Sequence, residues 1–256
     1  MKSGTATAED KLHIIVTGCN GGVGSFLVAR YLSKGHRAVG VDLATDLFNS
    51  PSHDGFKFSR CDITTHDGIK QIIDDCENFL TRVDLVVHAA GMFCADAELN
   101  REPTKYRTMW DSNFVAAHKL TSAIQPLLLK GRFPLVVFIS SVDAIVASGG
   151  RECEVGATHD IEYAATKGAL ITLTRALAMK LSKDGIRVNA ICPTIIRTPM
   201  SESLLRQPGK EAEICAHIPL GRICEPQDIA VAIECLYELR MTTAHVLTVD
   251  GGYLCY

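Results

Sequence analysis

The fold is decided by residues 12–24, which read Leu-His-Ile-Ile-Val-Thr-Gly-Cys-Asn-Gly-Gly-Val-Gly. The first six residues of this stretch are mostly apolar and rich in β-branched side chains, as in a buried strand. Gly18, Gly22 and Gly24 then permit a tight turn and a close approach of backbone N–H groups to a pyrophosphate. The apolar spacing of Val23–Ser33 is that of an amphipathic helix. The stretch therefore predicts a strand, a phosphate-binding turn and a helix in succession.

Short apolar segments alternate with longer amphipathic segments along the rest of the chain. The predicted strands are Leu12–Thr17, Ala38–Val41, Phe56–Cys61, Leu85–Ala89, Leu135–Ser140, Val188–Cys192 and Val246–Val249. The predicted helices are Val23–Ser33, Gly68–Leu80, Ser112–Leu129, Tyr163–Leu181 and Pro226–Leu239. This alternation predicts an α/β fold, a doubly wound parallel sheet of the Rossmann type.

No linker or repeat divides the chain, so we expect one domain over residues 12–256 after a disordered N-terminal tail at 1–11. Two segments do not fit the alternation, namely Ser148–Glu162 and Met200–Ile218. Long insertions in compact domains are often lids or substrate loops, and we expect that role for both. The second has the pattern of one or two short helices, and the first is expected to move as a lid.

Composition narrows the classes of function. Of the 256 residues, 47% are apolar and 21% charged, which is typical of a globular protein. The net charge of -3 gives no basic face for a nucleic acid or an anionic membrane, so neither is expected as a partner. The longest apolar runs, such as Leu135–Ile139, are too short to span a bilayer. Ten cysteines without a CxxC pair argue against a metal site or a disulfide scaffold and favour the reducing cytoplasm.

Asp42 closes the second predicted strand, eighteen residues after Gly24. A carboxylate at that place accepts hydrogen bonds from the adenosine ribose hydroxyls and repels a 2′-phosphate. No Arg or Lys lies in the glycine-rich turn or just after Asp42 to neutralise such a phosphate. The sequence therefore favours NAD over NADP. Asp62, after the third strand, is a weaker candidate for an adenine contact, because an Asp there also caps a turn.

Tyr163 and Lys167 are four residues apart at the start of a predicted helix, which places both side chains on one face. The ammonium group lowers the pKa of a neighbouring phenol, and so does a positively charged nicotinamide. A phenol tuned in this way exchanges a proton with an alcohol or carbonyl oxygen near neutral pH. The pair alone occurs often by chance, so the prediction depends on the motifs that accompany it.

Taken in order, these features resemble the short-chain dehydrogenase/reductase family, in its branch of compact single-domain members. The resemblance covers nearly all of residues 12–254. It rests on Thr17–Gly24, Asp42, Asp62, His88-Ala89-Ala90-Gly91, Asn113, Ser140-Ser141, Tyr163–Lys167, Asn189–Pro193, Pro219–Arg222, Pro226–Ala230 and Val249–Gly252.

The resemblance implies a catalytic role for four residues. Tyr163 would be the general acid/base, and Lys167 would hold the nicotinamide ribose hydroxyls and keep the phenolate accessible. Ser141 would hydrogen-bond the reacting oxygen of the substrate, while Ser140 beside it would be structural. Asn113 would hold a water in a proton relay towards the lysine.

The resemblance also implies a set of cofactor contacts, with Ile196 and Thr198 beside the nicotinamide carboxamide. The expected contacts are Gly18, Asn20, Gly21, Gly22, Val23, Gly24, Asp42, Leu43, Asp62, Ile63, Ala89, Ala90, Gly91, Tyr163, Lys167, Pro193, Ile196 and Thr198. Compact family members commonly pair through the helices that here contain Asn113 and Tyr163 and through the C-terminal segment Val249–Tyr256. A homotetramer or homodimer is therefore expected.

Three departures from the family pattern stand out. His88 and Ala89 replace two asparagines at the end of the fourth strand. Thr194 replaces a glycine after Pro193, which puts a Cβ near the nicotinamide. Ser141 and Tyr163 are 22 residues apart, which is longer than in most compact members.

Three functions remain open at this point. The favoured one is an NAD-dependent oxidoreductase that moves a hydride between nicotinamide and an alcohol or ketone. The alternatives are a sugar-nucleotide epimerase or dehydratase and a redox sensor that binds NAD(H) without turnover. Side chains near the expected site mouth fit polyols, hydroxy acids, acyl thioesters or a hydroxysteroid equally well, namely Asp143, His159, Asp160, Met200, Leu204 and Leu205.

Overall fold

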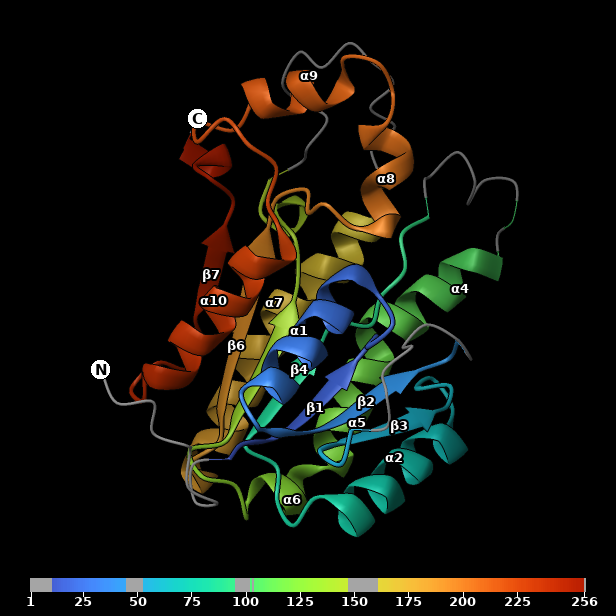
Figure 1. Ribbon diagram of the computed structural model, residues 1–256, viewed down its shortest axis with the longest axis vertical. Coiled ribbons are helices and arrows are strands. Elements are labelled where there is room, and N and C mark those ends of the chain that lie inside the picture. Colours follow the sequence, from blue (N-terminus) through green and yellow to red (C-terminus); the bar gives the residue numbers. More distant parts are fainter. Residues whose placement is uncertain (1–10, 45–52, 95–101, 103, 147–160, 256) are drawn as a thin grey trace.

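All seven predicted strands form, and they pair into one sheet whose strands are all parallel (Figure 1). The computed structural model describes residues 11–44, 53–94, 102, 104–146 and 161–255. The strands are β1 (His13–Thr17), β2 (Arg37–Asp42), β3 (Phe56–Arg60), β4 (Leu85–His88), β5 (Leu135–Ile139), β6 (Arg187–Pro193) and β7 (Val246–Val249). No strand end differs from its predicted position by more than one residue, because most of the strands are buried apolar runs bounded by polar or turn residues.

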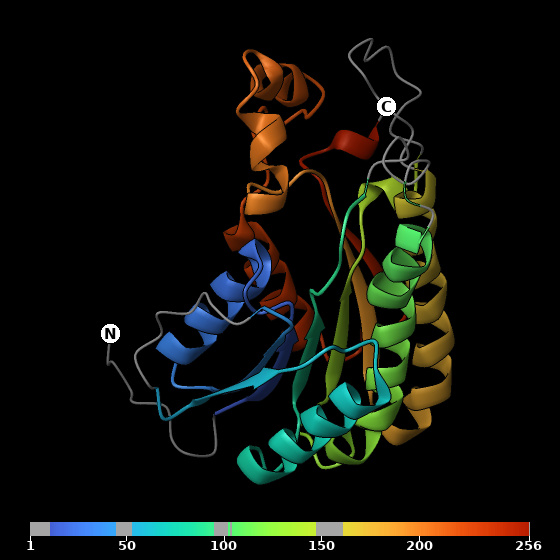
Figure 2. The same cartoon turned by 90° about the vertical axis from the view of Figure 1, so that its right-hand side faces the viewer.

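Helices cover both faces of the sheet, as Figure 2 shows. One face packs against α1 (Gly22–Ser33) and α10 (Pro226–Glu238) around a core that includes Leu27, Val28 and Ile233. The other packs against α2 (His66–Phe79), α5 (Ala116–Ala123) and α7 (Ile161–Leu181) around a second core. The predicted doubly wound α/β fold is therefore confirmed.

The strand order is β3-β2-β1-β4-β5-β6-β7, so the direction of winding reverses between β1 and β4. In sheets of this kind, ligands bind in the crevice outside the carboxyl ends of the strands at this switch point. The glycine-rich turn follows β1, and Ala89-Ala90-Gly91 follows β4, so both segments lie at the switch point. Two short helices, α8 (Pro199–Leu205) and α9 (Lys210–Ala216), stand above the same end of the sheet (Figure 1).

The helix predicted over Ser112–Leu129 differs from the observed one. The chain is already helical in α4 (Thr104–Trp110), continues through a π-helical turn, η1 (Asp111–Val115), into α5, and then breaks before a short α6 (Gln125–Leu128). The break follows from Pro126, whose ring has no N–H to donate and is accommodated in the first turn of α6. Only Met109 of α4 is buried, so α4 has little apolar periodicity to predict it.

The insertions are only partly described. Met200–Ile218 forms α8 and α9, as the pattern indicated. The end of Ser148–Glu162 was placed wrongly, because Ile161 and Glu162 already belong to α7, where the Glu162 carboxylate accepts a hydrogen bond from Trp110 Nε1 at 3.0 Å. The predicted lid at 148–160 and the predicted tail at 1–10 lie outside the described residues.

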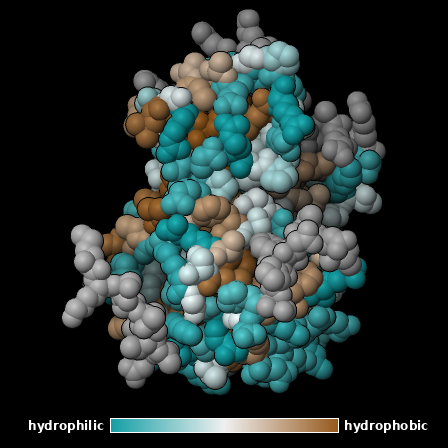
Figure 3. Space-filling view, viewed as in Figure 1, coloured by the Kyte–Doolittle hydropathy of each residue, from teal (hydrophilic) through white to brown (hydrophobic). Residues whose placement is uncertain are grey.

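The remaining described elements are single turns of 3₁₀ helix, namely η2 (Val142–Ala144), η3 (Ser182–Asp184) and η4 (Tyr253–Cys255). The face seen in Figure 3 is mostly hydrophilic over α2, which buries Gly68, Ile69, Ile72 and Cys76 on its inner side only. In the described part of the chain, no helix has both the length and the apolar character needed to cross a membrane.

Candidate active site

The turn after β1 is shaped for a ligand that approaches the backbone closely. Gly18 has φ of +67°, and a Cβ there would lie 2.7 Å from the backbone of Ala90. A Cβ on Gly24 would lie 2.1 Å from Gly18 O. Gly21 is the N-cap of α1, so the first N–H groups of the helix, at Gly22 and Val23, point out of the turn. These features fit a pyrophosphate at a helix N-terminus, and no side chain of the turn would block it.

Asp42 is fixed at the end of β2 by the turn itself. Its Oδ2 accepts a hydrogen bond from Asn20 N at 2.9 Å, and its Oδ1 accepts one from Ala44 N at 3.1 Å. The amide of Asn20 in turn donates to Ala44 O at 3.2 Å. Asn20 therefore holds the carboxylate beside the glycine-rich turn, and contact of Asp42 with a ribose stays a prediction. Leu43 is exposed next to it.

The other predicted adenine contacts lie one strand further out. Asp62 Oδ1 accepts hydrogen bonds from Thr64 N at 2.8 Å and from Thr64 Oγ1 at 2.7 Å. Thr65 is the N-cap of α2. Asp62 thus shapes the turn before α2, which matches the alternative role weighed for it, and Ile63 packs partly against the core. An adenine contact by either residue stays a prediction.

The end of β4 lies against the glycine-rich turn. Ala90 N donates to Thr17 Oγ1 at 3.1 Å, which ties β4 to the end of β1. A Cβ on Gly91 would come within 3.1 Å of Asn113 Oδ1 and 3.5 Å of Lys167 Nζ. The segment that includes Ala89 therefore leads from the phosphate turn directly to the predicted catalytic groups.

His88, one of the departures from the family pattern, is buried behind this segment. Its Nε2 lies 2.8 Å from Thr121 Oγ1 on α5, and its ring stacks on Phe138 with the centroids 4.9 Å apart. Burial lowers the pKa of His88 to about 3, so the ring is neutral. The contact between His88 and Thr121 thus connects β4 to α5 at the position where the family pattern has an asparagine.

Asn113 lies in the π-helical turn η1 and is buried. Its Oδ1 accepts from Met92 N at 2.8 Å, and its Nδ2 donates to Met92 O at 3.0 Å and to Thr166 Oγ1 at 3.0 Å. The side chain therefore joins the loop after β4 to α7, one residue before Lys167. π-Helical turns are frequent at functional sites, because they let a helix place one residue out of register.

Lys167 and Tyr163 share one face of the first two turns of α7. Lys167 is buried, and its Nζ donates to Ile139 O at 2.9 Å and lies 5.5 Å from the centroid of the Tyr163 ring. Burial lowers the pKa of Lys167 to about 8, while the charge of Asp143 opposes that shift. The Tyr163 ring also packs edge-on against Phe93, with the centroids 5.3 Å apart. The helix therefore presents a phenol and an ammonium group to the carboxyl end of β5.

Ser141 follows β5 and caps η2. Its Oγ donates to Asp143 Oδ2 at 2.9 Å and accepts from Asp143 N at 3.2 Å. Ser140 Oγ instead donates to Lys167 O at 2.8 Å, which supports its predicted structural role. Asp143 was expected only near the site mouth, and its bond to Ser141 was not predicted. A Ser followed two residues later by Asp is typical of a capped helical turn, and that signal could have found the pair.

The predicted nicotinamide contacts follow β6. A Cβ added to Gly22 would lie 2.6 Å from the Thr198 side chain, so Thr198 lies directly over the glycine-rich turn. Thr198 is also the N-cap of α8, in a capping box with Ser201. Ile196 pairs with Cys224 in a single β-bridge, and Thr194, beyond Pro193, is buried with its N–H bonded to Val249 O at 3.3 Å. The structure thus brings Thr198 against the glycine-rich turn and places the segment after β6 at the same end of the sheet.

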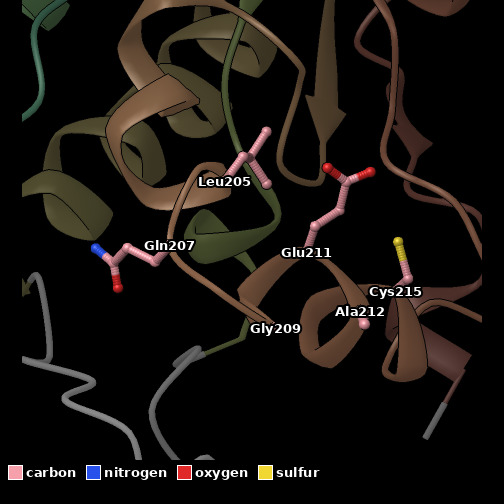
Figure 4. A pocket seen from close by; sticks show the side chains of 6 residues that line it. All are labelled: Leu205, Gln207, Gly209, Glu211, Ala212 and Cys215. Carbon is pink, nitrogen blue, oxygen red and sulfur yellow. The ribbon is translucent and has the colours of Figure 1, made fainter.

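Two hollows lie elsewhere on the surface. The first, about 430 Å³, lies between α8 and α9 and is lined by Leu205, Gln207, Gly209, Glu211, Ala212 and Cys215 (Figure 4). The second, about 510 Å³, lies at the amino ends of the strands beside Tyr31 and Arg132. Neither is lined by a predicted catalytic or cofactor-binding residue, so the candidate site remains the group of residues at the carboxyl ends of the strands beside the switch point.

A doubly wound sheet with a glycine-rich turn at its switch point and a Tyr–Lys pair beside it defines a Rossmann-type oxidoreductase. The model of the family described as Enoyl-(Acyl carrier protein) reductase matches residues 19–254. The chain therefore belongs to the short-chain dehydrogenase/reductase family, and the resemblance seen in the sequence is confirmed.

The individual relatives have a low sequence identity to this chain. A tropinone reductase homolog of Arabidopsis thaliana is 28% identical over 247 residues, covering 93% of this chain and 89% of the relative. The solved structure of 4-hydroxyisoleucine dehydrogenase complexed with NADH has a TM-score of 0.84 at 24% identity, covering 96% of this chain and 100% of that one. ElxO with NADP bound has a TM-score of 0.83 at 24% identity, with the same coverage. These two structures establish the likeness of fold.

Proposed function

We propose that this protein transfers a hydride between NAD(H) and an alcohol or ketone, with Tyr163 as the general acid/base. The observation that carries the proposal is the meeting of Tyr163, Lys167, Ser141 and Asn113 at the carboxyl end of the sheet, next to the glycine-rich turn. A protein that only bound a dinucleotide would need the turn but not a buried lysine beside a phenol. The similarity to a tropinone reductase homolog agrees with a ketone or alcohol as the substrate.

Each of these groups has a part in the proposed reaction. The nicotinamide would supply or accept the hydride. Tyr163 would give a proton to the carbonyl oxygen in reduction and take one from the hydroxyl in oxidation. Lys167 would hold a positive charge near the phenol and contact the ribose, because its Nζ lies 5.5 Å from the ring centroid. Ser141 would orient the reacting oxygen, and Asn113 would keep a water in line with Lys167.

The proposed cofactor is NAD, and this preference rests on Asp42. One related fold holds NADH and another NADP, so the fold alone does not choose between them. Asp42 is held by backbone N–H groups of Asn20 and Ala44, so the carboxylate has no freedom to swing away from a 2′-phosphate. Repulsion between the Asp42 carboxylate and a 2′-phosphate disfavours NADP.

The test is a titration of the purified protein with NADH and with NADPH, followed by fluorescence. NADH should bind at least about tenfold more tightly, a difference of about 1.4 kcal/mol. Asp42→Ala should reduce that preference, while Asp67→Ala, at an exposed position on the first turn of α2, should not. Equal affinities in the unaltered protein, or an unchanged preference in Asp42→Ala, would contradict the assignment.

Two further proposals concern the whole protein. Every cysteine in the described part of the chain is a free thiol, which supports a reducing compartment such as the cytoplasm. We also propose a homodimer or homotetramer that pairs through the helices containing Asn113 and Tyr163.

A further inference from the structure

The carboxylate of Asp143 is close to the proposed site of reaction. It lies on η2, two residues after Ser141, and accepts a hydrogen bond from the Ser141 hydroxyl at 2.9 Å. η2 packs against α7, which carries the proposed catalytic pair, and Asp143 is close enough to Lys167 for its charge to act on the lysine. A group bound next to Ser141 would therefore lie within reach of Asp143.

Asp143 is half-buried, and few protein groups donate to its carboxylate. An ionised carboxylate has two oxygens and about four acceptor sites. The described residues supply one side-chain donor, Ser141, and no Lys, Arg or His among them forms an ion pair with Asp143. Lys167, the cation that acts on it, has its Nζ bonded to Ile139 O. Burial raises the pKa of Asp143, because it costs free energy to remove part of the carboxylate from water, while the hydrogen bond from Ser141 and the charge of Lys167 act in the opposite direction.

A donor on the substrate would remove this cost. We propose that Asp143 is a specificity residue of the reaction proposed above, and that the preferred substrate carries a hydroxyl or a protonated amine on the carbon next to the reacting carbon. The inference rests on the proposed function, because Ser141 marks the place of the reacting oxygen only if that function holds. The two neighbouring oxygens of a gauche diol lie about as far apart as two hydrogen-bonded oxygens, so one could lie against Ser141 and the other against Asp143.

The same geometry excludes another class of substrate. A carboxylate on the carbon next to the reacting carbon would face Asp143 at close range, and two carboxylates at one site repel each other. Hydroxy acids, which the sequence left open, are therefore disfavoured. Among the classes that the sequence left open, polyols carry the donor that Asp143 needs, and amino alcohols carry a donor at the same place.

The test uses four alcohols that differ only in the group on the neighbouring carbon. These are cyclohexane-1,2-diol, 2-aminocyclohexanol, cyclohexanol and 2-hydroxycyclohexanecarboxylate. With NAD⁺ in excess, kcat/KM for the diol and the amino alcohol should exceed that for cyclohexanol by at least about tenfold, since a hydrogen bond to a charged group contributes about 1.5–3 kcal/mol. The carboxylate should be the poorest substrate.

Variants of Asp143 separate recognition from a role in folding. In Asp143→Ala, kcat/KM for the diol and for the amino alcohol should lie within about threefold of the value for cyclohexanol. The variant has no acceptor for the donor on the neighbouring carbon. Asp143→Asn should keep part of the diol preference, lose the amine preference and accept the carboxylate better. Asp67→Asn, which removes the same charge from an exposed position, should leave all the ratios unchanged.

Ratios between substrates are the informative quantity, because a folding defect lowers all four rates together. Unchanged ratios in Asp143→Ala would overturn the inference. If the unaltered protein binds NADH but oxidises none of the four alcohols, the proposed function fails. The affinities of the same four compounds for the NADH complex, followed by nicotinamide fluorescence, would then still show whether Asp143 selects a donor.

Discussion

The charge of Lys167 depends on a balance between burial and its neighbours. Burial lowers the pKa of this lysine to about 8, and the charges of Cys192 and Asp143 act in the opposite direction. Burial also raises the pKa of Cys192, so its thiol is neutral at pH 7 and gives the lysine no support there. Asp143 is therefore the anion that helps Lys167 to stay protonated near neutral pH. The residue proposed to select the substrate also supports the charge beside Tyr163.

Turnover should depend on the hydroxyl of Tyr163. Hydride transfer creates or consumes an alkoxide, and a proton must move at the same site to match that charge. Because a positioned proton-transfer group contributes about 10²–10⁴-fold, Tyr163→Phe should lower kcat by at least about a hundredfold. The measurement is steady-state oxidation of an accepted alcohol, with NADH binding followed in parallel by fluorescence.

Tyr31 provides a matched control for that substitution. It is buried on α1, away from the glycine-rich turn, and its hydroxyl makes no hydrogen bond with the described residues. Tyr31→Phe should therefore keep both turnover and NADH binding. If Tyr163→Phe retained near-normal kcat while Tyr31→Phe behaved as expected, Tyr163 would not be the proton-transfer group.

Most element positions could be predicted from the sequence, and the exceptions have physical causes. The central strands are continuous apolar runs because helices cover both faces of the sheet, so burial and sequence pattern agree. α4 was missed because only Met109 is buried in it. The break between α5 and α6 coincides with Pro126, a residue that the apolar spacing of Ser112–Leu129 does not take into account.

The candidate site could be predicted where its motifs are local. The Tyr163 and Lys167 pair and the glycine-rich turn are short patterns, and the structure brings them together at the switch point. The bond between Asn113 and Thr166 joins residues 53 positions apart, and no local pattern specifies such a partner. The partner of His88, which departs from the family pattern, could not be predicted either, because Thr121 lies 33 positions away in the sequence.

The link between β4 and α5 through His88 should make stability depend on pH. Thr121 Oγ1 donates to Ala117 O at 2.8 Å, so we assign the proton of the 2.8 Å bond to Nε2 of a neutral His88. Burial lowers the pKa of His88 to about 3 in the folded protein, whereas the unfolded value is 6.5. Between these two values the unfolded chain binds a proton that the folded chain does not. His88 therefore destabilises the fold progressively as the pH falls from 6.5 towards 3.

The prediction is tested by urea unfolding at several pH values between 6 and 4. The free energy of unfolding should fall with decreasing pH more steeply in the unaltered protein than in His88→Gln, by up to about 1.4 kcal/mol per pH unit. The pKa values of His13 and His36 are also lowered by burial, but both side chains remain in the variant, so their contribution cancels in the comparison. Parallel curves for the two proteins would show that His88 is accessible to protons in the folded state.

All parts of the proposed active site lie at one end of the molecule. The phosphate turn, the catalytic groups and the helices α8 and α9 all lie at the carboxyl ends of the strands (Figure 1). Arg197 connects α9 to the segment before α10 through ion pairs with Glu211 and Glu225. These side chains are about half exposed, and ion pairs of this kind contribute little to stability.

The outer face of α7 is the surface through which we propose that two subunits pair. Five residues with small or apolar side chains follow one another along one stripe of this helix at spacings of three and four, and all but the half-buried Ala169 are exposed. They are Ala165, Ala169, Thr172, Ala176 and Met179. The Met179 side chain is 83% exposed, which is unusual for a large apolar residue on a helix that also packs against the core. Small side chains let two helices approach closely, so a second copy of α7 would fit against this stripe.

The protein should therefore be a dimer or tetramer at micromolar concentration, as measured by light scattering coupled to size exclusion. Ala176→Glu should shift the equilibrium towards the monomer, because it would bury a charge opposite its own copy in a symmetric pair. Asn78→Glu, which adds the same charge at an exposed position on α2, should leave the mass unchanged. The proposed catalytic residues Tyr163 and Lys167 belong to the same helix, so dissociation of Ala176→Glu should also lower kcat if the partner holds α7 in place. A monomeric mass for the unaltered protein, or an undiminished mass for Ala176→Glu, would place the interface elsewhere or remove it.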